Sequence, residues 1–104
     1  MRLYNRKTIN AYRECHPKAD GALRAWVALI EGRSFRHFPE LKTVFGSADL
    51  IAGDRVVFDV MGNRYRLVAA VDFERQAVFV KWFGTHRQYD KIDPAEVEYG
   101  YPPC

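Results

Sequence analysis

Apolar residues recur at helical spacing in one segment near the start of the chain. They stand at i, i+3, i+4 and i+7, as Leu23, Trp26, Val27 and Ile30, a spacing typical of an amphipathic helix. Asp20 stands where an N-cap is expected, and Gly32 stands where such a helix would end. The pattern predicts a helix between Asp20 and Gly32 that can cover one face of a small sheet.

A short strand and another helix are predicted before the helix that begins near Asp20. Met1–Asn5 is predicted as a first strand, and Asn5 or Thr8 is suited to cap a helix that runs to about His16. Pro17 would stop that helix, because proline disfavours helical backbone in the residue before it. One face of the helix would carry Ile9, Tyr12 and Cys15 or His16.

Three strands follow in the second half of the chain. Arg55–Met61, Tyr65–Phe73 and Ala77–Phe83 are rich in Val, Phe and Tyr and are separated by short turn segments, of which Gly62-Asn63 is a tight hairpin signal. Sequential strands on short loops form an antiparallel meander. Residues 33–53 are expected to be a packed connector that ends in the turn-rich run at 46–49.

The middle strand carries information about its two faces. Tyr65, Leu67, Ala69 and Val71 alternate with Arg66, Val68, Ala70 and Asp72, so both faces are largely apolar and both must be at least partly covered. Arg66 is then a cation near the end of one sheet face. These patterns together predict helices in the first part of the chain and an antiparallel meander in the second half.

Composition and length narrow the class of protein. A chain of 104 residues with 48% hydrophobic residues fits a single domain, residues 1–104, with a core of its own. No apolar run approaches the ~20 residues of a membrane span, and the N-terminus lacks the apolar stretch of a secretory signal. We therefore expect a cytoplasmic protein without a membrane partner, in which Cys15 and Cys104 are two free thiols.

Charge is distributed unevenly along the chain. The net charge of +3 is the sum of +6 over Met1–Lys91 and −3 over the last thirteen residues, Ile92–Cys104. A basic body permits an anionic partner without identifying one. The acidic residues at the end, with Pro94, Pro102 and Pro103, predict an extended acidic tail at 92–104.

One segment after the last strand could carry chemistry. His86, Tyr89 and Asp90 are spaced i, i+3 and i+4, so one helical turn would place them on one side, with Arg87 and Lys91 on an adjacent side. Histidine and tyrosine can transfer protons and cations can stabilise a phosphate, which are the groups that metal-free RNA cleavage requires. Spacing alone favours a simpler interpretation, in which His86 caps a short helix, Tyr89 packs at a core edge and the cations are solvated.

A second group lies around the predicted hairpin. Asn63, Arg64 and Arg66 follow its turn, and Lys81 stands on the next strand. Arginine suits phosphate oxygens and a neighbouring aromatic suits a base, although a hairpin with surface cations explains these residues equally well. The three histidines are scattered without metal-ligand spacing, so we expect no metal and no cofactor.

An ordered set of short pieces resembles a known family. The pieces are His16-Pro17, Trp26, Leu41-Lys42 with Phe45 and Ser47-Ala48-Asp49, Val57-Phe58, Gly62-Asn63 with Tyr65-Arg66-Leu67, and Thr85-His86 with Tyr89-Asp90-Lys91. Together they resemble the HigB-type toxins of bacterial type II toxin-antitoxin modules, in the RelE/ParE superfamily. The resemblance implies an α+β, RelE-like fold, in which two N-terminal helices pack on a small, mostly antiparallel sheet and a short C-terminal helix follows. It also implies a ribosome-dependent endoribonuclease that cuts translated messenger RNA.

The resemblance also implies site residues and partners. Asn63, Arg66, His86, Tyr89 and Lys91 fall on family motif positions. We expect catalysis from His86, Tyr89, Lys91 and Arg66, and RNA binding from Asn63, Arg64, Lys81, Arg87 and Lys42. Arg64, Lys81 and Arg87 do not belong to the family motif and are included on charge and position only. The expected partners are messenger RNA, the ribosome and a HigA-like helix-turn-helix antitoxin. Two alternatives stay open: a non-enzymatic ParE-like inhibitor of a protein target such as gyrase, and a plain RNA-binding or ribosome-binding module.

Overall fold

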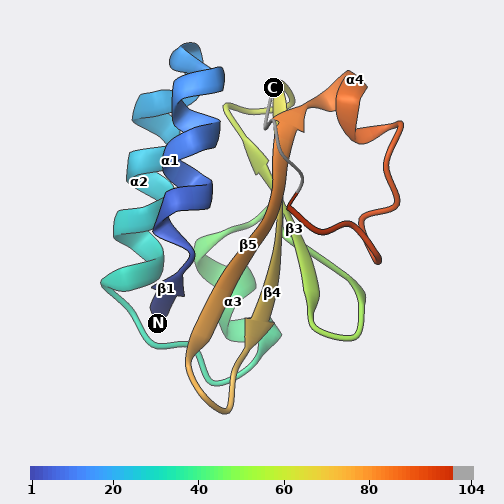
Figure 1. Cartoon of the computed structure of the whole chain (residues 1–104). Helices are drawn as coiled ribbons and strands as arrows, with labels where there is room; N and C mark the ends of the chain where they lie inside the picture. The colour runs from blue at the N-terminus through green and yellow to red at the C-terminus, as the bar shows by residue number, and fades with distance from the viewer. Residues whose placement is uncertain (100–104) are drawn as a thin grey trace.

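The strands form one mixed sheet in the order β1-β5-β4-β3-β2 (Figure 1). The computed structural model describes residues 1–99. β1 (Arg2–Tyr4) pairs parallel with β5 (Ala77–Thr85), whereas β4 (Tyr65–Asp72), β3 (Arg55–Val60) and β2 (Asp49–Ala52) continue the sheet in antiparallel pairs. The predicted antiparallel meander is therefore confirmed as β3, β4 and β5.

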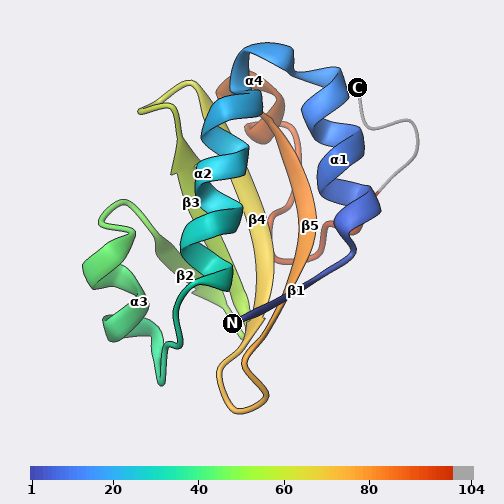
Figure 2. The same ribbon diagram turned by 90° about the vertical axis from the view of Figure 1, so that its left-hand side faces the viewer.

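Two helices cover one face of this sheet, as the spacing of apolar residues predicts. α1 (Arg6–Cys15) and α2 (Asp20–Glu31) lie side by side and are joined by the 3₁₀ turn η1 (Pro17–Ala19) (Figure 2). Their buried residues meet the inward residues of the strands in one core, which includes Ile9, Tyr12, Leu23, Trp26, Ile30, Phe58, Leu67 and Phe83. The expected α+β fold, with its N-terminal helices and the short C-terminal helix α4 (His86–Tyr89), is confirmed.

The helix ends differ in detail from the prediction. Ala19 is the N-cap of α2, and Asp20 is its first residue, where the carboxylate forms ion pairs with Arg13 at 2.6 Å and Arg24 at 3.0 Å. These contacts lower the pKa of Asp20, chiefly through the hydrogen bond from Arg13. Asn5 is the N-cap of α1, but its side chain makes no capping bond. Gly32 is the C-cap of α2, as predicted.

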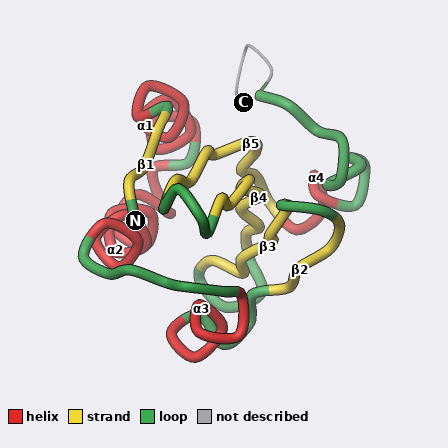
Figure 3. The backbone as a smooth tube through the Cα atoms, turned by 90° about the horizontal axis from the view of Figure 1, so that it is seen from below, coloured by secondary structure: helices red, strands yellow, loops and turns green. Residues whose placement is uncertain are grey.

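The predicted connector contains two elements that the sequence pattern did not reveal. α3 (Phe38–Val44) is capped by His37, whose Nδ1 accepts the Glu40 backbone N–H, and it lies beside the β2 end of the sheet (Figure 3). Its seven residues are too few to show a helical repeat. Every residue of β2 is exposed, so its sequence shows no alternation of buried and exposed positions.

A bulge in β5 determines which aromatic residues face the core. Val68 pairs with Trp82 and Ala69 pairs with Val80, so Lys81 is an extra residue in this strand. Because side chains alternate along a strand, the bulge allows Val80 and Phe83 both to face the helices. Trp82 then turns to the opposite face of the sheet, which also buries Val68.

The last described residues return to that opposite face. The guanidinium of Arg55 donates to the backbone oxygen of Val97 at 2.5 Å and to Glu98 Oε1 at 2.8 Å, and the Arg55 side chain is only 10% exposed. Tyr99 continues to α1, where its ring lies 5.5 Å from that of Tyr12. The described part of the predicted acidic tail is therefore packed against the sheet; residues 100–104 lie outside the described residues.

Two further expectations concern the cysteines and the membrane. The prediction of a free thiol is wrong for Cys15, because the structure contains no free cysteine among the residues it describes; Cys104 lies outside them. Within residues 1–99, none of the helices combines the length and the apolar character that crossing a bilayer requires.

His16 makes the stability of the fold depend on pH. Its ring packs against Tyr65 and Phe83, and its Nε2 is buried without a hydrogen-bond partner among the described residues. Burial lowers the pKa of His16 from its ordinary value of 6.5. Between 6.5 and the lower folded-state pKa, the unfolded chain binds more protons, so the free energy of unfolding falls as the pH drops through this range.

We predict that His16→Phe removes this part of the pH dependence, since phenylalanine keeps an aromatic ring at the site but binds no proton. Urea unfolding between pH 7.5 and pH 5 measures the effect. The variant should gain stability relative to the natural protein as the pH is lowered. Parallel stability curves for the two proteins would show that His16 protonation does not contribute.

Candidate functional site

Arg66 lies at the centre of the candidate site, on the sheet face opposite α1 and α2. Strand pairing places it opposite Asp59 in β3 and Gly84 in β5. Its Nε lies 3.1 Å from Asp59 Oδ1, and its Nη2 donates to Asn63 Oδ1 at 2.5 Å. Nη1 donates to the backbone oxygen of Tyr65 at 3.1 Å. These contacts hold the guanidinium in one orientation and leave other N–H groups for an anion.

Gly84 gives Trp82 room beside Arg66. A Cβ at this position would lie 2.6 Å from both the Trp82 ring and Gln88 Oε1, closer than packed atoms can approach. Trp82 can therefore lie across the strand only because residue 84 is glycine. Its ring is 6.2 Å from the ring of Tyr89, so the wall beside Arg66 is aromatic.

Tyr89 is brought to this wall by α4. Thr85 caps the helix by accepting the Gln88 backbone N–H, and the Gln88 side chain accepts the Thr85 backbone N–H in return, which is a complete capping box. Burial is the main cause that raises the pKa of Tyr89; the charges of Asp49 and Asp59 add to it and Arg66 opposes it. Tyr89 is thus a neutral phenol near neutral pH, able to donate a proton.

His86 is the first residue of α4 and lies at the rim of the site. The interpretation that His86 caps this helix is wrong, because Thr85 is the N-cap. The prediction that His86 and Asp90 lie on the same side of a helical turn is confirmed, since His86 Nδ1 lies 3.9 Å from Asp90 Oδ2. The His86 side chain is 48% exposed, which leaves its ring accessible to a substrate.

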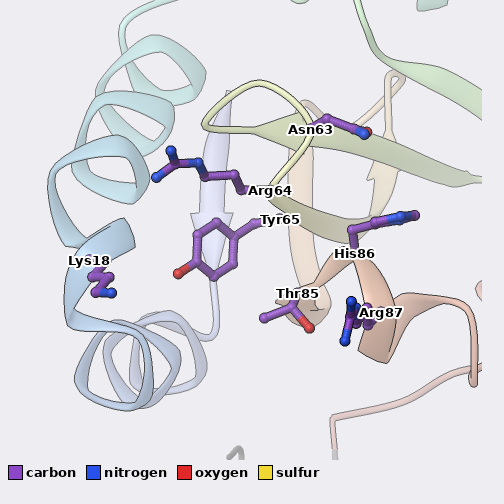
Figure 4. A pocket seen from close by; sticks show the side chains of 7 residues that line it. All are labelled: Lys18, Asn63, Arg64, Tyr65, Thr85, His86 and Arg87. Atoms are coloured by element: carbon purple, nitrogen blue, oxygen red, sulfur yellow. The ribbon is translucent and has the colours of Figure 1, made fainter.

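A pocket of about 420 Å³ adjoins His86 at the end of the sheet. It is lined by Lys18, Asn63, Arg64, Tyr65, Thr85, His86 and Arg87 (Figure 4). Asn63, Arg64, His86 and Arg87 were predicted as site residues, and the structure brings them together here. Lys18 could not be predicted from the sequence, because it comes from η1 and reaches the pocket only through the packing of the helix layer on the sheet.

Comparison with known proteins identifies the family. Residues 19–92 match the family model HigB_toxin, described as the RelE-like toxic component of a toxin-antitoxin system. The chain belongs to this family. It is also 34% identical over 92 residues to the mRNA interferase toxin HigB of Escherichia coli (strain K12), across 86% of this chain and 88% of that protein.

Two other curated relatives are also mRNA interferases of the HigB type. The mRNA interferase HigB of Shigella flexneri is also 34% identical over 92 residues, with the same coverage of 86% and 88%. The mRNA interferase HigB of Escherichia coli O6:H1 is 30% identical over 86 residues, across 78% of this chain and 84% of that protein. The predicted resemblance to HigB-type toxins is thus confirmed.

Three predicted lysines of this HigB-family chain lie outside the pocket. Lys42 donates to the backbone oxygens of Ala48 at 2.7 Å and Gly46 at 3.2 Å, and so closes the end of α3. Lys81 pairs with Glu98 at 2.9 Å. Lys91, just after α4, is exposed and forms no ion pair with any residue in 1–99.

Sequence reasoning missed Asp59 and Trp82 as members of the site. Pairing the predicted strands with Gly62-Asn63 in the turn would have placed Asp59 opposite Arg66. Trp82 had no comparable signal, because its orientation depends on the bulge at Lys81. No three potential metal ligands of the His, Cys, Asp or Glu type gather in the part of the chain that the structure describes.

Residues 93–99, which bind the Arg55 guanidinium through Val97 and Glu98, lie beyond the HigB-family match, which ends at residue 92. Hydrogen bonds from Lys81, and then the nearby positive charges, lower the pKa of Glu98. Backbone N–H groups of Glu96 and Val97 are bonded to the Asp93 oxygen. This local turn and the contacts of Arg55 together fix the segment on the sheet.

We predict that Arg55→Met releases residues 93–99 from the sheet while the site remains folded. Hydrogen-deuterium exchange should become faster at the Glu96 and Val97 amides, and the free energy of unfolding should fall by about 1–3 kcal/mol, the usual effect of removing such a bonded charged group. Arg75→Met is the control, since Arg75 lies 84% exposed beside Asp72. Equal exchange in the two variants would contradict a holding role for Arg55.

Proposed function

We propose that this HigB-family toxin is an endoribonuclease that cleaves translated messenger RNA on the ribosome and so inhibits translation. The observation that carries the proposal is the guanidinium of Arg66, fixed by Asp59 and Asn63 on the same face as the protonated Tyr89. The family match and the names of the curated relatives, which are mRNA interferases, support it.

The reaction needs two proton transfers and no metal ion. The 2′-oxygen of a ribose attacks the adjacent phosphorus and loses its proton, while the bond from phosphorus to the 5′-oxygen breaks and that oxygen gains a proton. The products are a 2′,3′-cyclic phosphate and a free 5′-hydroxyl. His86 is accessible and takes the first proton, and Tyr89 donates the second as a neutral phenol. Arg66 and Lys91 stabilise the negative charge that develops on the phosphate.

Other predicted residues hold the RNA. Asn63, Arg64 and Arg87 line the pocket beside His86 and contact the chain next to the scissile bond. Lys42 and Lys81 contribute at the periphery, where each must exchange a contact that it already makes within the protein. RNA therefore binds mainly at the end of the sheet, and not over the whole basic part of the chain.

The proposed partners follow from the family. A toxin-antitoxin family implies an antitoxin, and we propose a HigA-like helix-turn-helix protein that prevents access to the ribosome. We propose a cytoplasmic location, because a toxin that acts on translated messages must reach ribosomes. Co-expression with the neighbouring reading frame should relieve growth arrest if that frame encodes the antitoxin.

We predict that His86→Ala abolishes toxicity and lowers cleavage about 10²- to 10⁴-fold, the usual contribution of a general acid or base. Cleavage of a message on purified, programmed ribosomes measures this rate, and thermal unfolding checks that the variant folds. His37→Asn is the matched control, because asparagine preserves the capping role of His37 far from the site. Full activity of folded His86→Ala would remove His86 from the mechanism.

Mapping of new 5′ ends after induced expression separates the proposal from its two alternatives. A ribosome-dependent nuclease produces new ends within messages only while they are translated. A ParE-like inhibitor would leave messages intact and cause DNA damage. A plain binding module would show RNA or ribosome binding that weakens with salt, without new ends even in excess protein.

A further inference from the structure

Cations of the described chain fall into two groups. Most arginines are held in ion pairs with carboxylates, namely Arg6, Arg13, Arg24, Arg36, Arg55, Arg66 and Arg75. By contrast, seven exposed cations make no ion pair with any residue between 1 and 99, namely Arg2, Lys7, Lys18, Arg33, Arg64, Arg87 and Lys91. Three of them, Lys18, Arg64 and Arg87, line the same pocket, and no carboxylate is among its lining residues.

The three side chains come from separate elements of the fold. Lys18 belongs to η1 in the helix layer, Arg64 precedes β4, and Arg87 belongs to α4. Figure 4 shows Tyr65 between Lys18 and Thr85, with its hydroxyl on the Lys18 side, and the Arg64 side chain extended toward the helix layer. A concave surface with positive charge on several sides and no acidic group attracts an anion.

The backbone on both sides of the pocket is fixed by packing. Ala19, next to Lys18, is completely buried, and the ring of His16 packs on that of Tyr65 at 5.6 Å. Across the pocket, the His86 backbone N–H donates to the Arg64 oxygen at 3.0 Å. Packing therefore fixes the backbone on both sides of the pocket, which lowers the cost of ordering these side chains around an anion.

We propose that this pocket is a second phosphate-binding site for RNA, separate from the reacting phosphate at Arg66, and that Lys18 is its positioning residue from the helix layer. In Figure 4 the His86 ring points away from Lys18 and Arg64. Tyr65, which lines the pocket, is followed in β4 by Arg66, whose side chain lies on the other face of the sheet, so the pocket and Arg66 lie on two sides of the sheet end. An RNA strand that crosses the end of the sheet contacts both. The identity of the anion as RNA rests on the proposed function; the anion site itself rests on the three cations.

The first experiment measures binding without cleavage. The probe is a single-stranded 12-nucleotide RNA with 2′-O-methyl groups throughout, which cannot be cut by attack of a 2′-oxygen. Lys18→Ala should bind it several-fold more weakly, and the slope of log K against log salt should fall by about 0.7, the value for one phosphate contact on a single strand. Lys18→Arg should retain affinity and slope. Lys7→Ala is the control, because Lys7 is an exposed lysine of α1 outside the pocket.

The second experiment identifies the source of the phosphate. Sedimentation with ribosomes is compared for Lys18→Ala and Lys7→Ala, with and without a bound message. Weaker binding of Lys18→Ala to empty ribosomes assigns the pocket to ribosomal RNA, and weaker binding only to programmed ribosomes assigns it to the message. Either result supports the proposal.

Two results overturn the inference. One is an RNA affinity and salt slope of Lys18→Ala equal to those of Lys7→Ala. The other is normal RNA binding with weakened binding of a co-expressed protein partner, which would assign the pocket to a protein carboxylate. Failure of the natural protein to cut any message would contradict the proposed function instead, and the binding experiment would still decide the pocket because its probe is never cut.

Discussion

The register of β4 is the constraint on which the site depends. β4 is paired on both sides, with Arg66 opposite Asp59 in one neighbour and opposite Gly84 in the other. Because side chains alternate across a sheet, a slip of one residue would move Arg66 into the core beneath α1 and α2 and turn Leu67 to the opposite face. The apolar core therefore fixes the position of Arg66, although it contributes no chemistry itself.

The same register has consequences on both sides of β4. On the β3 side it supplies the carboxylate of Asp59 that orients Arg66. On the β5 side it places Gly84 where the Trp82 ring can cross the strand and pack near Tyr89. α4 follows β5 without a loop, so the positions of His86 and Tyr89 are set by the end of that strand. A packed apolar sheet thus specifies a polar site at its end.

Charge pairing then decides which cations are available to an anionic ligand. The described C-terminal segment engages Lys81 through Glu98, at 2.9 Å, and covers Arg55. Lys18, Arg64 and Arg87 remain without acidic partners among residues 1–99, and all three surround the pocket beside His86. The modest net charge of the whole chain, +3, therefore gives little indication of the positive charge at the end of the sheet.

Much of the fold could be predicted from the periodicity of apolar residues. The features that could not be predicted share a physical cause. α2 and the strands of the meander show regular alternation because each has one long face in the core. α3 is too short and β2 too exposed to show such a pattern. The bulge at Lys81, the pairing of that residue with Glu98, and the approach of Lys18 to Arg64 depend on tertiary contacts between distant segments. Local sequence carries no record of contacts of this kind.

The nucleophile offers the most direct test, since we propose that His86, Tyr89 and Arg66 support an attack by the 2′-oxygen of the RNA itself. A message should be placed on ribosomes with a single 2′-deoxy nucleotide on the 5′ side of the bond that is cut in the unmodified message. This bond should remain intact while the unmodified message is cut there. Cleavage of the substituted bond at the normal rate would contradict the proposed mechanism, because the attacking oxygen would then have to come from elsewhere.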